Sequence, residues 1–202
     1  ATTTTVTVQA FTESLCIDCK HFFDRQLLPA YQRLGSDVID LQLAPFGKAK
    51  IISSDDETVT CQHGDAECDA NSWEQCALLA YPMPDKHLPF FGCLEGTLPM
   101  GHEDVPFDAV VFGKCAGESG LEFDRLRDCH DNPETSWALQ EKYAKLTPDD
   151  HDHVPWVLID GWKFDEEKED LAEEVCKAYS RKTGGLPHPN CASVIDVAKL
   201  SS

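Results

Sequence analysis

The sequence contains no hydrophobic run that approaches the roughly 18 residues of a membrane-spanning helix, and no signal peptide. We therefore expect no membrane insertion. The first residues, Ala1 and a run of threonines, are typical of a processed or trimmed start, so the missing signal gives no information about a precursor. Asn71, Asn132 and Asn190 all lack a serine or threonine two positions on, so N-linked glycans have no acceptor at these asparagines.

Basic residues are scarce, with 17 Lys and Arg against 36 Asp and Glu, for a formal net charge of −19 at pH 7. Nucleic acid and anionic membrane surfaces would repel such a chain, which excludes a general nucleic-acid binder. The simplest interpretation of the charge is solubility. The alternative is an acidic compartment, where protonation of carboxylates and histidines would relieve the self-repulsion.

Cysteine, by contrast, is abundant. Ten cysteines in 202 residues exceed the usual content of a cytosolic enzyme, and the even number predicts several disulfides formed in an oxidising, secretory environment. One pair, Cys16 and Cys19, has C-x-x-C spacing. We expect structural disulfides among the other eight, which are Cys61, Cys68, Cys76, Cys93, Cys115, Cys129, Cys176 and Cys191.

The N-terminal part predicts a β–α–β unit. Apolar and polar residues alternate over residues 6–10, which predicts a strand. Apolar residues then recur from Cys19 at three- and four-residue spacing, which predicts a helix that is kinked at Pro29 and ends at Gly35. Residues 38–43 predict a second strand, parallel to the first and joined to it by a right-handed crossover.

The C-terminal part predicts a β-hairpin over residues 156–164, turning at Asp160 and Gly161. A helix over about 166–182 follows, with acidic first turns and basic last residues, and it ends at Gly184. A β–α–β unit followed by a β-hairpin and a helix is the thioredoxin arrangement.

The middle of the chain does not belong to this plan, and it contains six of the ten cysteines. "NSWEQCALLAY" and "PETSWALQEKYAKL" predict helices, whereas residues 82–120 are rich in proline and glycine and predict an irregular segment. We therefore predict a single thioredoxin-like α/β domain over residues 1–202. Its core comprises about 1–50 and 151–202, and a disulfide-rich, mostly helical insertion spans about 51–150.

Cys16 and Cys19 lie at the predicted junction between the first strand and its helix. The N-terminus of a helix stabilises a thiolate on the first cysteine, and the second can attack a mixed disulfide from the same helical face. We therefore predict that Cys16 is the nucleophile and Cys19 the resolving thiol. A structural disulfide between them would close too small a loop to add much stability.

A zinc site is the alternative interpretation of this cysteine pair. It needs a second set of ligands, and none of the other cysteines forms a C-x-x-C pair. Further ligands would have to come from Cys61, Cys68, Cys76, His63, His151 and His153. We favour the redox interpretation and predict no metal.

Two further pairs of residues are candidate site residues. Pro155 opens the predicted third strand, where a thioredoxin arrangement places a cis-proline facing the C-x-x-C pair. A proline there would leave the backbone of Val154 free to bind an extended substrate, although a trans-proline at the start of a strand is the ordinary alternative. Ile17 and Asp18 separate the two cysteines and are candidate modulators.

Asp18 bears on the direction of the reaction. An acidic residue beside Cys16 disfavours the thiolate, which makes the reduced pair a better electron donor and favours a reductase. The alternative is that Asp18 is a solvated first-turn residue with little redox effect.

The stretch "CQHGDAECDANSWEQC" resembles the signature of the gamma-interferon-inducible lysosomal thiol reductase (GILT) family: C-Q-H-G, two residues, E-C, two residues, N, four residues, C. The upstream C-x-x-C, the "VPW" before the third strand and the late cysteine pair are also similar, so the resemblance spans nearly the whole chain. The matching signature positions are Cys61, Gln62, His63, Gly64, Glu67, Cys68, Asn71 and Cys76.

The resemblance implies a thioredoxin-like fold with a helical insertion and a soluble enzyme that reduces protein disulfides, in animals within acidic endosomes and lysosomes. By position, the resemblance implies that Cys16 and Cys19 are the active pair. For the signature cysteines, Gln62 and His63 we expect structural roles. The missing glycan acceptors remove the signal that routes animal members, so we expect the secretory pathway, with a lysosome or vacuole or the extracellular space as destination. We favour a Cys176–Cys191 bridge, while the pairing within the insertion stays open.

We therefore predict a thiol-disulfide reductase that needs no cofactor. Its partners would be disulfide-containing proteins and an external reductant, either a small-molecule or a protein thiol; the oligomeric state stays open. The alternatives are a DsbA-like oxidase or isomerase and a secreted, non-catalytic client-binding protein. One conflict remains: near pH 5 a thiol with a pKa of about 7 is only about 1% thiolate, so activity in acid requires a lowered pKa, which Asp18 opposes.

Overall fold

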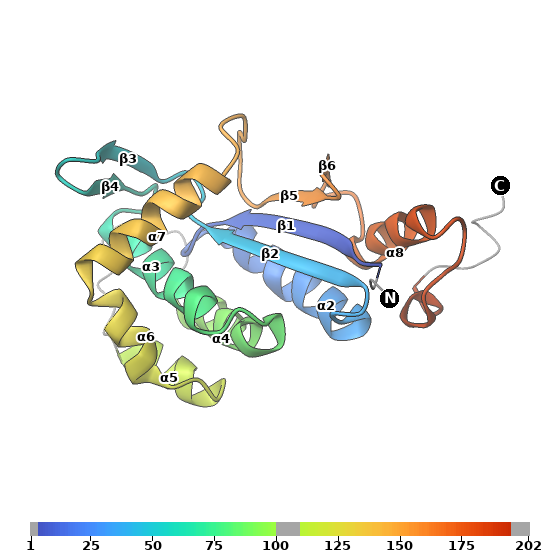
Figure 1. The fold of residues 1–202 in the computed structure, drawn as a ribbon, viewed down its shortest axis with the longest axis horizontal. Coiled ribbons are helices and arrows are strands. Elements are labelled where there is room, and N and C mark those ends of the chain that lie inside the picture. Colours follow the sequence, from blue (N-terminus) through green and yellow to red (C-terminus); the bar gives the residue numbers. More distant parts are fainter. Residues whose placement is uncertain (1–3, 100–109, 195–202) are drawn as a thin grey trace. The chain divides into compact units, whose positions relative to one another are not determined.

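A computed structural model of the chain describes residues 4–99 and 110–194. A π-helical turn, Phe23–Leu27, separates α1 from α2, and a 3-10 turn, Pro189–Cys191, follows α8. The other elements, labelled as in Figure 1, are β1 (Val6–Thr12), α1 (Ile17–Phe22), α2 (Leu28–Leu34), β2 (Ile39–Pro45), β3 (Lys50–Ser53), β4 (Thr58–Thr60), α3 (Asp65–Ala80), α4 (Pro84–Thr97), α5 (Val110–Glu118), α6 (Phe123–His130), α7 (Pro133–Leu146), β5 (Trp156–Ile159), β6 (Trp162–Lys163) and α8 (Leu171–Lys182).

The chain divides into two compact units, which are described separately. The first consists of residues 1–10, 21–42 and 156–202, and the second of residues 11–20 and 43–155. The single domain and the bounds of the insertion that the sequence predicts remain a prediction.

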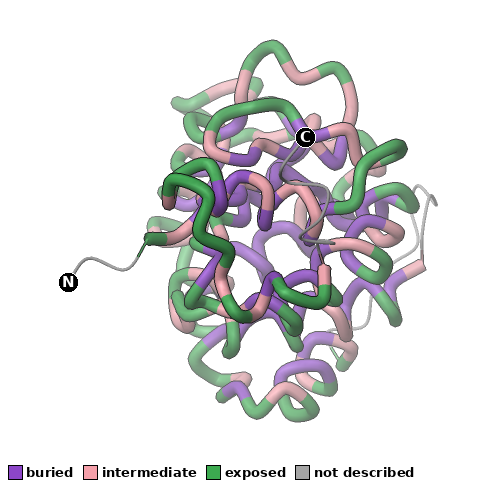
Figure 2. Tube along the Cα trace, turned by 90° about the vertical axis from the view of Figure 1, so that its right-hand side faces the viewer, coloured by how far each residue is buried: buried purple, intermediate pink, exposed green. Residues whose placement is uncertain are grey.

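The first unit is built on a four-stranded sheet with the strand order β2-β1-β5-β6. The alternation that predicts the first strand reflects burial, because Val6, Val8 and Ala10 are all fully buried. Figure 2 colours the trace by burial and shows buried, intermediate and exposed stretches following one another along the chain. Among the described residues, no helix is long and apolar enough to cross a membrane.

The predicted hairpin is present as β5 and β6, which pair antiparallel with Ile159 opposite Trp162. Its two turn residues, Asp160 and Gly161, have φ angles of 49° and 81°. Positive φ at both central residues is what a type I′ turn requires, and the twist of that turn matches the twist of the strands it joins.

The helical segment after the cysteine pair is interrupted just ahead of Pro29. The irregularity is the π-helical turn Phe23–Leu27, and Pro29 lies in the first turn of α2, where a missing N–H costs least. The helix ends at Gly35, whose φ of 69° suits a glycine. The sequence predicts a kink or break at Pro29, and the structure has the irregularity about one turn before this proline.

The last helix begins later than the sequence predicts. We expect a start near Glu166, but α8 begins at Leu171, because the side chain of Asp170 caps the helix and accepts the backbone N–H of Glu173 at 2.8 Å. In the same unit α8 contacts α2 and β5. A disulfide between Cys176 and Cys191 joins α8 to the 3-10 turn, which is the bridge that we favour from the sequence.

The second unit contains helices α3 to α7 and a small sheet. Helix α3 contacts α4, α6 and α7. The indole of Trp73 on α3 is 3% exposed and stacks on the rings of Phe112 and His130, at centroid distances of 4.8 and 4.2 Å. Burial of such aromatic area is a large part of what holds small helices together.

One expectation for the middle of the chain is wrong. Residues 82–120 are not irregular: they include α4 and α5, while residues 100–109 lie outside the described range. Pro84 starts α4, a position where proline is favourable. Pro89 lies within the helix, and the buried side chains of Phe90 and Phe91 offset its missing hydrogen bond. The polar stretch after residue 50, to which we assign no element from the sequence, forms the β3–β4 hairpin.

All eight cysteines outside the C-x-x-C pair form disulfides. Within the second unit these bridges are Cys61–Cys68, Cys76–Cys129, which joins α3 to α6, and Cys93–Cys115, which joins α4 to α5. Cys76 and Cys115 are fully buried, whereas Cys61 and Cys68 are both partly exposed. The bridges replace a large part of the core that short helices cannot supply.

Replacing both Cys76 and Cys129 with alanine should lower the free energy of unfolding by about 4 kcal/mol, against about 2 kcal/mol for Cys61 and Cys68. The reason is that the bridges close loops with sequence separations of 53 and 7, and the longer loop restricts the unfolded chain more. Denaturant unfolding of the two double variants, at equal pH and with the other bridges intact, measures the difference. Equal losses, or the reverse order, would contradict this account.

Candidate active site

The turn between β1 and α1 places Cys16 immediately before the first residue of α1. Leu15 in this turn has a φ of 67°, a left-handed conformation that costs a residue with a side chain about 1–2 kcal/mol. Its side chain is fully buried, so packing offsets that cost. The backbone N–H of Cys19, in the first turn of α1, donates to Cys16 Sγ at 3.4 Å.

The two cysteines are free thiols with different environments. Interaction with the Cys19 side chain lowers the pKa of Cys16, helped by the backbone N–H groups of Cys19 and Asp18 and opposed by burial and by the charge of Glu13. Cys19 is fully buried, and burial raises its pKa well above the usual value. The geometry therefore favours ionisation of the outer thiol, Cys16, over that of the inner thiol, Cys19.

The residues predicted on the strand side of the site lie beside this pair. Cys16 Sγ donates to the carbonyl oxygen of Val154 at 3.9 Å, and the two cysteines and Val154 form one buried cluster. The Val154–Pro155 peptide bond is cis, the geometry that the thioredoxin arrangement predicts. Ile17 is 46% exposed, and Asp18 is also exposed.

The zinc interpretation finds no support in these residues. Its sulfur ligands would include Cys61, Cys68 and Cys76, and each of them is in a disulfide. A disulfide sulfur offers no thiolate, which is the form that binds zinc.

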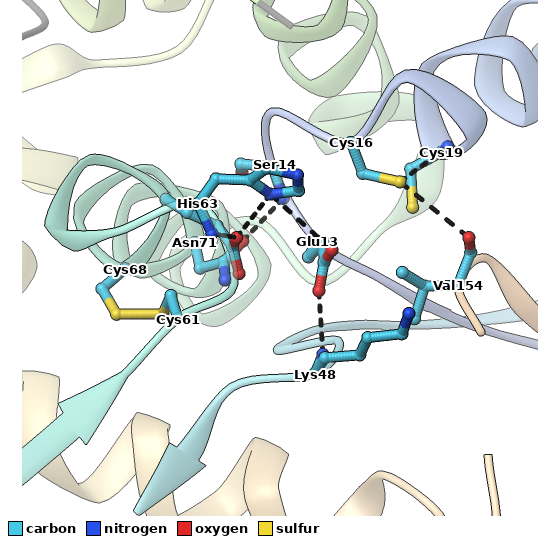
Figure 3. A network of polar contacts seen from close by, with 11 residues as sticks. Glu13, Ser14, Cys16, Cys19, Lys48, Cys61, His63, Cys68, Asn71 and Val154 are labelled. Atoms are coloured by element: carbon cyan, nitrogen blue, oxygen red, sulfur yellow. Dashed lines mark hydrogen bonds and ion pairs between the residues drawn. A yellow bond between two sulfur atoms is a disulfide. The ribbon is translucent and has the colours of Figure 1, made fainter. Parts of the chain in front are cut away.

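The signature stretch packs against the turn that leads to Cys16 (Figure 3). Gly64 has a φ of 77° at the start of α3, which explains a glycine at that position. The side chain of Asn71 accepts the backbone N–H of Ser14 at 2.8 Å. Glu67 Oε2 contacts both the backbone N–H and the Nδ1 atom of His63, each at 2.7 Å. Several signature residues thus have defined structural partners.

Glu13 is a site residue that our sequence reasoning missed. Its side chain is 1% exposed, Oε2 accepts the backbone N–H of Lys48 at 2.8 Å, and Oε1 lies 3.8 Å from His63 Nδ1. Gly47 has a φ of 56°, and a Cβ atom there would lie 2.3 Å from Glu13 Oε2, so only glycine leaves room for this carboxyl group. The sequence signal was an acid in the largely apolar stretch "AFTESLC", three residues before the first cysteine.

Glu13 and Glu67 form a pair of buried carboxyl groups near His63. Burial and the charge of Glu67 raise the pKa of Glu13 to about 7. The backbone N–H of Lys48 and the charges of His63 and Lys48 act in the opposite direction and lower it. Burial also raises the pKa of Glu67 to about 7. The Oε1 atoms of both glutamates are buried and have no hydrogen-bond partner among the described residues. These groups therefore exchange protons near neutral pH.

Glu13, His63 and Glu67 also have ligand-type atoms within 4.8 Å of one another, a grouping of residue types that is found at metal centres. The 2.7 Å between His63 Nδ1 and Glu67 Oε2 is a hydrogen-bond distance, shorter than the about 3.3 Å that separates two ligands of a tetrahedral ion with bonds of about 2.0 Å. We interpret the three residues as a hydrogen-bonded cluster.

Comparison with solved structures identifies the fold. The chain superposes on an oxidised DsbA from Mycobacterium tuberculosis with a TM-score of 0.65 and 16% identity, covering 98% of this chain and 90% of that one. It superposes on oxidised BdbD from Bacillus subtilis with a TM-score of 0.62 and 17% identity, covering 89% and 88%. The fold is the thioredoxin-like α/β fold of these proteins, with a dithiol at a helix N-terminus.

Fold, dithiol and sequence relatives together define a thiol-disulfide oxidoreductase. A family model described as "Gamma interferon inducible lysosomal thiol reductase (GILT)" matches residues 7–119. The chain belongs to this family, so the resemblance found in the sequence is confirmed.

Curated relatives agree with this assignment. The chain is 34% identical to a gamma-interferon-responsive lysosomal thiol protein of Arabidopsis thaliana, over 88% of this chain and 72% of the relative. It is 31% identical to the gamma-interferon-inducible lysosomal thiol reductase of Carassius auratus, over 86% and 68%. The mouse protein of the same name is 29% identical, over 95% and 73%.

In the reduced protein, Cys16 should react with iodoacetamide before Cys19. Cys16 has the lowered pKa and is 7% exposed, whereas Cys19 is fully buried with a raised pKa. Brief alkylation at neutral pH followed by peptide mass spectrometry measures the occupancy of each site. Equal labelling of the two thiols, or faster labelling of Cys19, would show that this division is wrong.

The free energy of unfolding should fall as the pH rises from about 5 to about 8. Glu13 and Glu67 have folded-state pKa values of about 7, above the ordinary 4.5, so the folded state holds protons that the unfolded state has lost. Their stabilisation is complete below the unfolded pKa and disappears as the pH passes about 7.

Glu13→Gln should remove on the order of 2 kcal/mol of this pH dependence, because glutamine does not titrate. Denaturant titrations at several pH values, compared between the native chain and the variant, cancel the contribution of the other acidic groups. Parallel profiles for the two proteins would rule out a raised pKa at Glu13.

Proposed function

We propose that the protein reduces disulfides of protein substrates through Cys16 and Cys19. The observation that carries the proposal is the position of the Cys16 thiol before α1, with the Cys19 N–H donated to its sulfur and a lowered pKa. A thiolate is the attacking species in disulfide exchange. The family match supports the direction of electron transfer.

The reaction takes two exchange steps. The Cys16 thiolate attacks one sulfur of the substrate disulfide, so a Cys16–substrate disulfide forms and the other substrate sulfur leaves as a thiolate. Cys19 then loses its proton and attacks Cys16 Sγ, which releases the second substrate thiol and leaves Cys16 and Cys19 as a disulfide. Two electrons pass to the substrate. An external thiol, small-molecule or protein, must return two electrons for the next cycle, and the chemistry needs no cofactor.

Val154 and Pro155 would hold the substrate chain beside Cys16. The carbonyl oxygen of Val154 lies 3.9 Å from Cys16 Sγ, which donates to it. When Cys16 forms a mixed disulfide, it has no thiol proton to donate, so this carbonyl can accept a backbone N–H of the bound substrate. An extended peptide bound through its backbone suits substrates of varied sequence. The exposed side chain of Ile17 offers an apolar contact next to the attacking sulfur.

The residues between the cysteines would tune the reaction. Asp18 is exposed at the start of α1, and its backbone N–H lowers the pKa of Cys16. The carboxylate itself acts in the opposite direction and favours the reducing direction. We keep Ile17 and Asp18 as modulators of rate and potential.

We infer that the protein works in the secretory pathway, in a lysosome or vacuole or after secretion. Four disulfides support an oxidising site of folding, and the names of the Arabidopsis and fish relatives support an acidic destination. The net charge of −19 is compatible with acid, where part of it is neutralised.

A DsbA-like oxidase with the same dithiol is the second candidate, favoured by the likeness of its fold to DsbA structures. The reduction potential of the Cys16–Cys19 pair separates the two, because thioredoxin lies at about −270 mV and DsbA at about −120 mV. A value near the second figure would overturn the reductase proposal.

Cys16→Ser should lower disulfide reduction by about a hundredfold or more at every pH from about 4 to 8, because the nucleophile is lost. Cys19→Ser should instead accumulate a mixed disulfide with substrate, visible as a thiol-sensitive band on a non-reducing gel. Asp18→Asn is the matched control at the site and should keep activity within about threefold. Full activity or full biological effect of Cys16→Ser would support a non-catalytic client-binding protein.

A further inference from the structure

Glu13 connects the dithiol to the signature residues. The backbone N–H of Glu13 interacts with Cys19 and opposes the rise in the pKa of that thiol. The side chain of Glu13 points to His63 (Figure 3). The carboxyl group lies between the two thiols on one side and His63 and Asn71 on the other. A change in the charge of Glu13 is therefore felt at Cys16, whose pKa that charge raises.

The surroundings of Glu13 make its charge variable rather than fixed. The carboxyl group is 1% exposed, receives one backbone N–H from Lys48, and has its Oε1 atom buried without a hydrogen-bond partner among the described residues. A buried carboxylate usually accepts two or three hydrogen bonds. Titratable and charged groups that face Glu13, Ser14 and the thiols from neighbouring elements are His63, Glu67, Lys48, Glu74 and Glu95.

We propose that Glu13 is a positioning residue of the dithiol, which takes up a proton in acid and so removes a negative charge from beside Cys16, and that His63 and Glu67 set the pH of that uptake. The proposal rests on the role of Cys16 as the nucleophile.

Protonation of Glu13 in acid removes one charge that disfavours the Cys16 thiolate. When Glu13 is protonated, ionisation of Cys16 gives the site one negative charge, and when Glu13 is ionised, the same step gives it two. The two groups therefore titrate as a coupled pair, with the first proton lost more easily than the second. The charge penalty that Glu13 places on the Cys16 thiolate is therefore absent in acid and appears as the pH rises.

His63 and Glu67 act on Glu13 with opposite signs. A positive charge on His63 stabilises the Glu13 carboxylate, whereas the Glu67 carboxylate destabilises it. After burial, the charge of Glu67 is the largest cause of the raised Glu13 pKa. Glu67 in turn holds His63 in place by the two 2.7 Å contacts. On this proposal, His63 and Glu67 of the signature act chemically on the dithiol, in addition to their structural role at the start of α3.

Reduction potentials measured as a function of pH test the coupling. The native chain, Glu13→Gln and the control Asp18→Asn would be equilibrated in thiol redox buffers, quenched by alkylation, and the Cys16–Cys19 pair quantified by mass spectrometry. Between pH 5 and pH 8 the ratio of the native and Glu13→Gln equilibrium constants should change by about threefold to tenfold, or about 15–30 mV for two electrons, with the native chain the stronger reductant at pH 8. Asp18→Asn, which replaces an exposed carboxyl group outside the buried cluster, should change the corresponding ratio less over the same pH range.

Thiolate absorbance of the reduced proteins near 240 nm gives an independent readout of the same coupling. With Glu13 fixed as a neutral residue, Cys16 should titrate in one step, and the thiolate fraction at any pH should be equal to or larger than that of the native chain. Curves that superpose for the two proteins, together with a potential difference that does not change with pH, would overturn the proposal.

Variants of the signature residues make the test directional. His63→Gln should move the midpoint of the pH-dependent step to higher pH, and Glu67→Gln should move it to lower pH, since they remove opposite charges from beside Glu13. A purely structural role would move both in the same direction or neither, and either result would overturn the proposal. These two variants also carry the test if Glu13→Gln does not fold.

The outcomes separate this proposal from the proposed function. If Cys16→Ser keeps its activity, the nucleophile is misassigned and the reductase mechanism fails with it. If Cys16→Ser is inactive while the Glu13→Gln profiles match those of the native chain, the mechanism stands and only the role of Glu13 is wrong.

Discussion

The site depends on one buried turn that cannot relax. Glu13, Ser14 and Leu15 leave β1 and must deliver Cys16 to the start of α1, with Leu15 in a left-handed conformation. Two contacts from outside the turn hold it there: Asn71 accepts the N–H of Ser14, and the N–H of Lys48 is donated to Glu13. The Ser14–Asn71 contact is buried and the Lys48–Glu13 contact is partly buried, and Glu13 itself is 1% exposed. Breaking either contact would leave a buried polar group without a partner, which is costly.

The signature motif packs against the turn that leads to the dithiol. The Cys61–Cys68 and Cys76–Cys129 disulfides hold α3 near its first and last turns, and Gly64 allows the sharp start of the helix. The histidine, glutamate and asparagine of the motif face the turn before Cys16. Motif and dithiol are more than forty residues apart in the sequence. In the fold they meet at the turn before Cys16.

The sequence predicts the parts of the fold that obey a local rule and misses the parts set by distant contacts. Alternation identified β1, the Asp160-Gly161 pair identified the hairpin, and the C-x-x-C at a strand–helix junction identified the dithiol. Residues 82–120 appeared irregular because local propensity penalises proline and glycine, whereas buried side chains such as Phe90 and Phe91 decide the outcome. Glu13 had only a weak local signal, an acid three residues before the first cysteine, because its surroundings come from Gly47, His63 and Glu67.

The disulfides differ in how well they are covered, and this limits the conditions under which a disulfide reductase of this design can work. Each of three bridges has at least one sulfur-bearing residue that is almost fully buried, but Cys61 and Cys68 are both partly exposed. A reductant able to reduce a disulfide between Cys16 and Cys19 would also meet this bridge, and access governs which disulfide a thiol attacks. Since Cys61–Cys68 encloses His63 and Glu67, the enzyme's own scaffold sets an upper bound on the reducing strength of its surroundings.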